Sequence, residues 1–220
     1  MDKEKEKGAV VLPENAFREL KDGETYEPLM SPNKTYREVT PWSVTWGLVM
    51  VVLFSAAAAY LGLKVGQVFE AAIPIAIIAI GLSTATHRKN ALGENVIIQS
   101  IGACSGAVVA GGIFVMPAIY MLDLQADFIK IFIAAALGGI LGILFLIPFR
   151  KYFVKDMHGK YPFPEATATT QVLVSGGEGG SQAKPLLVAG LVGGAYDFIV
   201  ATFGWWNENV PSRMIGPGQD

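Results

Sequence analysis

The chain has 220 residues, of which 52% are hydrophobic and 16% charged, and its mean hydropathy is +0.42. Soluble domains carry about a quarter charged residues, so this composition argues against a soluble globular domain and indicates a bilayer as the solvent. The net charge of −2 gives no argument for a nucleic-acid partner, and the single cysteine, Cys104, excludes an internal disulfide and a cysteine zinc cluster.

Residues 1–40 form a polar N-terminal region that holds almost half of the charged residues of the chain. No apolar core follows its basic residues, so it is not a cleavable signal peptide. We expect a largely solvated cytoplasmic tail without chemistry of its own, with a short helix around Glu14 to Lys21.

Residues 41–220 are expected to form an all-α polytopic transmembrane domain. About twenty apolar residues in a helix cross roughly 30 Å of hydrocarbon. Aromatic residues near the ends of the first apolar run, Trp42, Trp46 and Tyr60, are typical of membrane interfaces. We predict five transmembrane helices, over residues 42–63, 66–86, 95–122, 128–149 and 185–205.

Prolines and glycines indicate where these helices bend and pack. Pro74 predicts a kink or a delayed start in the second helix, and Pro117 makes a break in the third plausible. Small residues four apart let helix backbones approach closely within a membrane. This pattern occurs at Gly102-x-x-x-Gly106, Gly138-x-x-x-Gly142 and Gly190-x-x-x-Gly194.

The basic residues fall mainly on one side of this topology, and such residues concentrate in cytoplasmic links. The predicted orientation, in the inner cell membrane, has the N-terminus cytoplasmic and the C-terminus outside. The basic residues that it assigns to the cytoplasm are Lys34, Arg37, Arg88, Lys89, Arg150, Lys151, Lys155, Lys160 and Lys184.

An unusually polar stretch, Tyr161–Leu173, lies between the fourth and fifth runs. It is too short to cross, so we predict a re-entrant or interfacial helix over residues 164–175. Pro164 suits a first helical turn, and Glu165 favours the positive end of the helix dipole. These two residues could simply make a good helix start. Alternatively, the free amides there could hold an anion such as a peptide carboxylate.

Neutral hydrogen-bonding side chains in and near this stretch could line a path for a substrate. Thr167, Thr170 and Gln171 share roughly one side of the predicted helix, and Glu165 and Thr169 share another. Asn95 and Gln99 lie on one face of the third helix, where they could contact substrate or form hydrogen bonds between helices. The candidate substrate-binding residues are Tyr161, Glu165, Thr167, Thr169, Thr170, Gln171, Asn95 and Gln99.

Two carboxylates lie in the apolar runs, Glu70 and Asp197. A carboxylate deep in a bilayer costs about 3 kcal/mol on insertion scales, so Asp197 is expected to face other helices or water. Glu70 could face a polar cavity or lie at the interface. His158 has no partner ligand in the sequence and is expected to be a loop residue, and we predict neither a metal site nor a cofactor.

Three pieces of the chain resemble the oligopeptide transporter (OPT) family, particularly its prokaryotic branch. They are Tyr161–Leu173, Gly93–Gly102 and Gly62–Gly66, in the expected order. The first resembles the family's Tyr-Pro-x-x-x-Ala-Thr-Ala segment, which is related to Tyr-Pro-Ser-Gly-Thr-Ala in plant yellow stripe-like members. The resemblance covers nearly all of the chain beyond the tail, but only the N-terminal part of the family's roughly sixteen-span proteins. We therefore expect a fragment, a truncated product or one half of a split gene.

The resemblance implies secondary transport of small peptides or metal–peptide chelates, usually coupled to protons. Glu70 and Asp197 then become candidates for proton coupling. The expected partners are the lipid bilayer, the substrate, protons, and the remainder of the transporter or a homo-oligomer. The alternative is a membrane scaffold or accessory subunit without transport activity of its own. An enzyme is not expected, because no serine or metalloprotease motif lies in a span.

Overall fold

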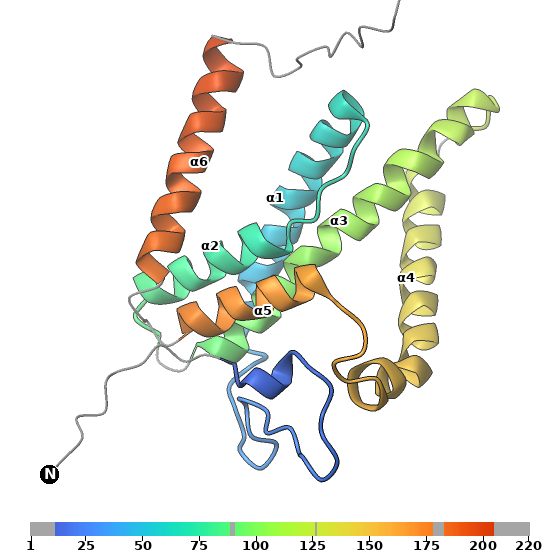
Figure 1. Cartoon of the computed structure of the whole chain (residues 1–220). Helices are drawn as coiled ribbons and strands as arrows, with labels where there is room; N and C mark the ends of the chain where they lie inside the picture. The colour runs from blue at the N-terminus through green and yellow to red at the C-terminus, as the bar shows by residue number, and fades with distance from the viewer. Residues whose placement is uncertain (1–11, 89–90, 126, 178–182, 205–220) are drawn as a thin grey trace, which may run out of the picture.

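The structure is a computed structural model that describes residues 12–88, 91–125, 127–177 and 183–204 (Figure 1). The described part of the chain is helical and contains no strand, which confirms the predicted all-α class. The elements in order are η1 (Glu14–Ala16), α1 (Pro41–Val65), α2 (Ala72–Ala85), α3 (Leu92–Met121), α4 (Phe128–Lys151), the π-helical turn η2 (Tyr152–Asp156), α5 (Pro164–Gly177) and α6 (Ala183–Phe203).

Three of the described helices are long and apolar enough to cross a membrane. These are the segments Pro41–Lys64, Leu92–Met121 and Phe128–Asp156. α2 and the apolar part of α6 are shorter, so the described chain has three helices of full spanning length where five were expected.

α1 begins and ends where its sequence provides caps. The Thr40 and Ser43 side chains each bond the other's backbone amide, and Pro41 occupies the first turn, where a missing amide hydrogen costs nothing. Gly66 ends the helix with a left-handed φ of 75°.

The second predicted helix is helical only from Ala72, because Gln67–Ala71 has no regular secondary structure. Figure 1 shows this link running back from the end of α1 toward the middle of α3. It passes close to Gly106 of α3, where an added Cβ would lie 3.4 Å from the carbonyl oxygen of Phe69. Pro74, which lacks an amide hydrogen, then sits in the first turn of α2. The physical result is a half-length helix that begins beside the middle of α3.

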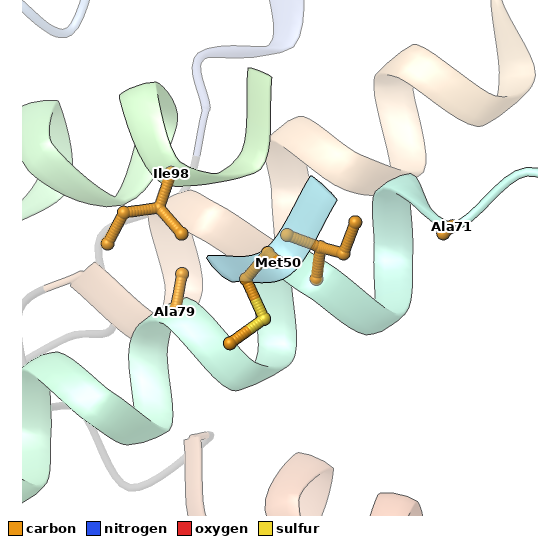
Figure 2. Packing of buried hydrophobic residues seen from close by; sticks show 5 residues of the cluster. Met50, Ala71, Ala79 and Ile98 are labelled. Carbon is orange, nitrogen blue, oxygen red and sulfur yellow. The ribbon is translucent and has the colours of Figure 1, made fainter. Parts of the chain in front are cut away.

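The core lies where α1, α2 and α3 meet (Figure 2). Met50, Ala71, Ile75, Ala79 and Ile98 form one buried cluster. The Gly102-x-x-x-Gly106 pattern makes this approach possible, as predicted. A Cβ on Gly102 would lie 2.9 Å from Ile75 side-chain atoms and 3.2 Å from the Cβ of Met50.

The third and fourth helices differ from expectation in detail. α3 continues through Pro117 without a break, so the single hydrogen bond that this proline removes does not end the helix. None of the residues of α4 is buried, and a Cβ on Gly138 or Gly142 would meet no described atom within 4 Å. The close packing predicted at Gly138-x-x-x-Gly142 therefore has no partner among the described residues.

The N-terminal region is less detached than predicted. Its short helix spans only Glu14–Ala16, and the rest of residues 12–40 folds into a lobe of turns. Figure 1 places this lobe, in blue, next to α5 and the α4–α5 connection. Many of its side chains are exposed. The region nevertheless forms hydrogen bonds with the rest of the chain, between Asn15 and His158 and between Thr40 and Glu94. Its apolar residues also gain stability by covering apolar surface.

Candidate functional site

A cavity of about 570 Å³ lies among the N-terminal lobe, the start of α2, α3 and α5. Its lining combines apolar side chains with a few hydrogen-bonding and ionisable groups, the usual composition of a small-molecule site. The lining residues are Leu12, Tyr26, Leu29, Met30, Glu70, Ala72, Leu92, Val96, Gln99, Ala103, Glu165, Ala166, Thr169, Thr170, Leu173 and Val174.

α5 supplies the polar wall of the cavity. Its lining residues repeat with helical periodicity and so form one face of the helix. Thr169 is buried, and its hydroxyl donates to the carbonyl oxygen of Glu165 at 2.8 Å. Thr170 donates in the same way to Ala166 at 2.7 Å. Because both hydroxyl protons are used within the helix, these side chains offer the cavity their oxygen lone pairs.

The cavity-lining face of α5 includes residues from both of the groups that helical spacing predicted. Thr170 faces the cavity with Glu165 and Thr169, whereas Thr167 and Gln171 do not line it. The rotation of α5 is fixed by its packing on α2, since a Cβ on Gly176 would collide with Ile80. Sequence spacing alone could not show which face this contact selects.

Tyr161 lies outside the cavity, before α5 begins. It is 46% exposed, and its ring lies between those of Phe153 and Phe163, at centroid distances of 6.1 and 6.4 Å. This position suits an aromatic residue at an interface better than a contact with a ligand in the cavity.

The two predicted polar residues of α3 occupy different environments. Gln99 lines the cavity. Asn95 is fully buried, and its side-chain amide donates to the Ser83 hydroxyl of α2 at 3.1 Å. Its Oδ1 has no hydrogen-bond partner among the described residues. Asn95 thus follows the inter-helix alternative, while Gln99 remains a candidate contact for substrate.

The beginnings of two helices meet at the cavity. Ala72, the first residue of α2, lines it, as do Glu165 and Ala166 in the first turn of α5. No side chain caps the N-terminus of α2. Helix N-termini carry partial positive charge and free amide donors, which favour anions. The cavity therefore offers a binding position for an anionic group of a ligand, and it also contains two carboxylates, Glu70 and Glu165.

Of the two proton-coupling candidates, Glu70 lines the cavity and is close to α3. Its Oε1 would lie 3.9 Å from a Cβ on Gly106. The backbone of Asp197 lies in α6, but its side chain falls outside the described part of the structure.

Two groups of residues escaped the sequence analysis. The first group consists of the lobe residues that line the cavity. Because we expected this region to be a solvated tail, the sequence analysis did not single them out. The second surrounds Glu94 of α3, which is 3% exposed. Arg88 donates to both of its carboxylate oxygens, and Thr40 donates at 2.7 Å. Arg88 lies in the charged turn just before Glu94, but Thr40 is distant in the sequence, and its contact with Glu94 depends on the fold.

The described residues contain no group of three or more His, Cys, Asp or Glu side chains that could hold a metal ion. The fold and the cavity together define a helical membrane protein with a mainly apolar cavity that carries a few polar and ionisable groups. A family model described as OPT oligopeptide transporter protein matches residues 38–217. The chain belongs to this family, and it is an integral membrane protein.

A relative from Haemophilus influenzae, named "Putative oligopeptide transporter", is 33% identical over 144 residues. The match covers 64% of this chain and 22% of the relative, so the chain spans about a fifth of that protein's length. No solved structure matches this chain.

Proposed function

We propose that this chain is the N-terminal portion of a secondary transporter that moves oligopeptides or metal–peptide chelates across the inner cell membrane. The observation that carries the proposal is the cavity that Glu165, Thr169 and Thr170 of the family-like segment share with the start of α2. Transport of this kind needs binding and alternating access, with no covalent chemistry on the substrate.

The cavity has groups suited to both ends of a peptide. The exposed amides at the starts of α2 and α5 would hold the carboxylate. Glu70 or Glu165 would hold the amino group, and Gln99 with the two threonines would bond the peptide unit. A protonated carboxylate no longer attracts the amino group, so protonation of Glu70 would couple substrate release to a proton. Asp197 is the second candidate for this role.

The remaining parts of the proposal follow from the chain's length and charge. Basic residues support a cytoplasmic N-terminus and an outside C-terminus. The remainder of the transporter, or further copies of the chain, would complete the path. The family match favours this interpretation over the accessory subunit.

Two substitutions in the complete protein test the proposal, measured as uptake of labelled peptide by proteoliposomes under an imposed proton gradient. We expect Glu165→Gln and Thr169→Val each to reduce uptake at low peptide concentration by about tenfold, equivalent to a loss of about 1.4 kcal/mol. Thr167→Val is the matched control, because Thr167 lies on the same helix outside the cavity.

Normal uptake by both variants would show that this face of α5 does not bind substrate. Uptake that ignores peptide and proton gradient in the unmodified protein would disprove the transport proposal itself. Activity that requires co-purification of a separate transporting subunit would instead support the accessory role.

A further inference from the structure

The N-terminal lobe supplies one wall of the cavity. Leu12, Tyr26, Leu29 and Met30 line it, opposite residues of α3 and α5. Tyr26 and Met30 are half-buried, although they belong to a region rich in charge. Apolar side chains in a polar segment gain stability by covering apolar surface, so this wall exists only while the lobe stays in place.

The lobe is held on the turn between η2 and α5 by three contacts. The Nε2 of His158 donates to the backbone carbonyl of Asn15 at 2.9 Å. The rings of His158 and Tyr26 lie 5.2 Å apart. Gly159, with a φ of 73°, lies so close to the backbone of Arg18 and Glu19 that a Cβ there would overlap both. The docking surface therefore requires glycine for its space as well as its conformation.

One carboxylate organises the docked part of the lobe internally. Glu24 accepts from the guanidinium of Arg18 at 2.8 and 2.9 Å, and from the side chain of Asn15 at 3.3 Å. The amide of Lys21 also donates to it, at 3.0 Å. The same stretch carries the backbone atoms of Asn15, Arg18 and Glu19 that contact His158 and Gly159, and Tyr26 follows it directly. Residues 12–30 can thus move as a unit, because the contacts that hold them on the turn are few and lie outside the apolar core.

We propose that residues 12–30 form a removable cytoplasmic plug of the cavity, docked through His158 and Gly159. With the plug docked, the lobe closes the cavity on the side that the basic residues assign to the cytoplasm. With the plug undocked, the buried Thr169 opens to that side. As a gate for transport this inference rests on the proposed function, but the plug itself can be tested without any substrate.

The test uses the complete protein in membrane vesicles, with Cys104 and any other native cysteine replaced by serine and with Val174→Cys as a reporter, because Val174 lines the cavity and is buried while the lobe is docked. The measurement is the rate at which a water-soluble maleimide labels the reporter from the cytoplasmic side. Gly159→Ala should raise this rate by roughly five- to thirtyfold, the factor that one or two kcal/mol of lost docking produces. His158→Ala, which keeps the glycine, should raise it in the same direction.

Gly23→Ala is the matched control. Gly23 has a φ of 81°, so the substitution causes the same backbone strain within the lobe, but no atom lies within 4 Å of the added Cβ. Its labelling rate should stay close to that of the reporter protein. Unchanged labelling in Gly159→Ala and His158→Ala variants that elute normally from a sizing column would overturn the plug. Plug-dependent labelling of the reporter, together with no peptide uptake by the unmodified protein, would instead leave the plug standing and remove the proposed function.

Discussion

At the scale of single residues, the ion pair of Arg88 and Glu94 is the contact that we expect to matter most for stability. The Glu94 side chain is 4% exposed and that of Arg88 is 29% exposed, and the guanidinium also lies 4.5 Å from the centre of the Trp42 ring. Removing one partner of such a pair leaves a buried charge without compensation, whereas removing both does not. The pair joins the starts of α1 and α3 through Thr40.

We therefore expect Arg88→Met to destabilise the protein by about 3 kcal/mol. The double variant Arg88→Met with Glu94→Gln should recover much of that loss, since no buried carboxylate remains. The melting temperature in detergent, followed by size-exclusion chromatography after heating, measures the effect. A double variant less stable than Arg88→Met would show that the pair is not the reason.

Residue chemistry was more predictable from the sequence than residue orientation. The segment around Glu165 could be singled out because its polar side chains contrast with their apolar surroundings. Thr167 and Thr169 are equivalent in the sequence, and the packing of α5, which includes the close contact between Gly176 and Ile80, places one in the cavity wall and the other outside it. Asn95 and Gln99 also differ because of packing, since Ser83 of α2 lies beside Asn95 and accepts a hydrogen bond from its side-chain amide.

At the scale of elements, the long apolar helices could be predicted because hydrophobic length dominates their formation. The half-length of α2 could not be predicted with certainty. Pro74 indicated either a kink or a late start, and the non-helical link Gln67–Ala71 passes close to Gly106 of α3, a contact that the sequence did not reveal. The order in the N-terminal lobe was missed because its stabilising contacts come from residues far away in the sequence, including His158.

The lobe should loosen in acid, and Glu24 gives the pH range. Chiefly because of the hydrogen bond from Arg18, the pKa of Glu24 is lowered from 4.5 to about 2. A carboxylate whose pKa falls on folding contributes stability above its unfolded pKa and loses it as pH falls through the folded value. The contribution is therefore complete above pH 4.5 and disappears between there and about pH 2.

Hydrogen–deuterium exchange of the lobe amides measures this, with the unmodified protein and Glu24→Gln compared at each pH. We expect the unmodified protein to be better protected at pH 6 and the difference to shrink as the pH falls below 4.5. Glu27→Gln is the control, because Glu27 makes no hydrogen bond or ion pair in the described part of the chain. Equal protection of Glu24→Gln and the unmodified protein at pH 6 would contradict the role of Glu24.

At the scale of the whole molecule, α4 is the long apolar helix that buries none of its residues against the described chain. No residue of α4 is buried, although it carries small residues on one face and large apolar ones on the other. Without a driving force from water, helices in a membrane associate through close packing at small residues. The match covers 22% of the relative from Haemophilus influenzae, and we propose that the glycine face of α4 packs against a helix outside the described residues.

The last prediction tests that assignment on the two faces of α4. Gly142→Leu in the complete protein should lower the melting temperature, since a large side chain would separate two closely packed helices, at a cost of about 1–3 kcal/mol. Ile140→Ala, on the opposite face, should change it little, because that face meets lipid. Gly142→Leu should lower the melting temperature more than Ile140→Ala only if a helix lies against Gly138 and Gly142. A greater loss for Ile140→Ala would place the protein partner on the large-residue face and the lipid against the glycines.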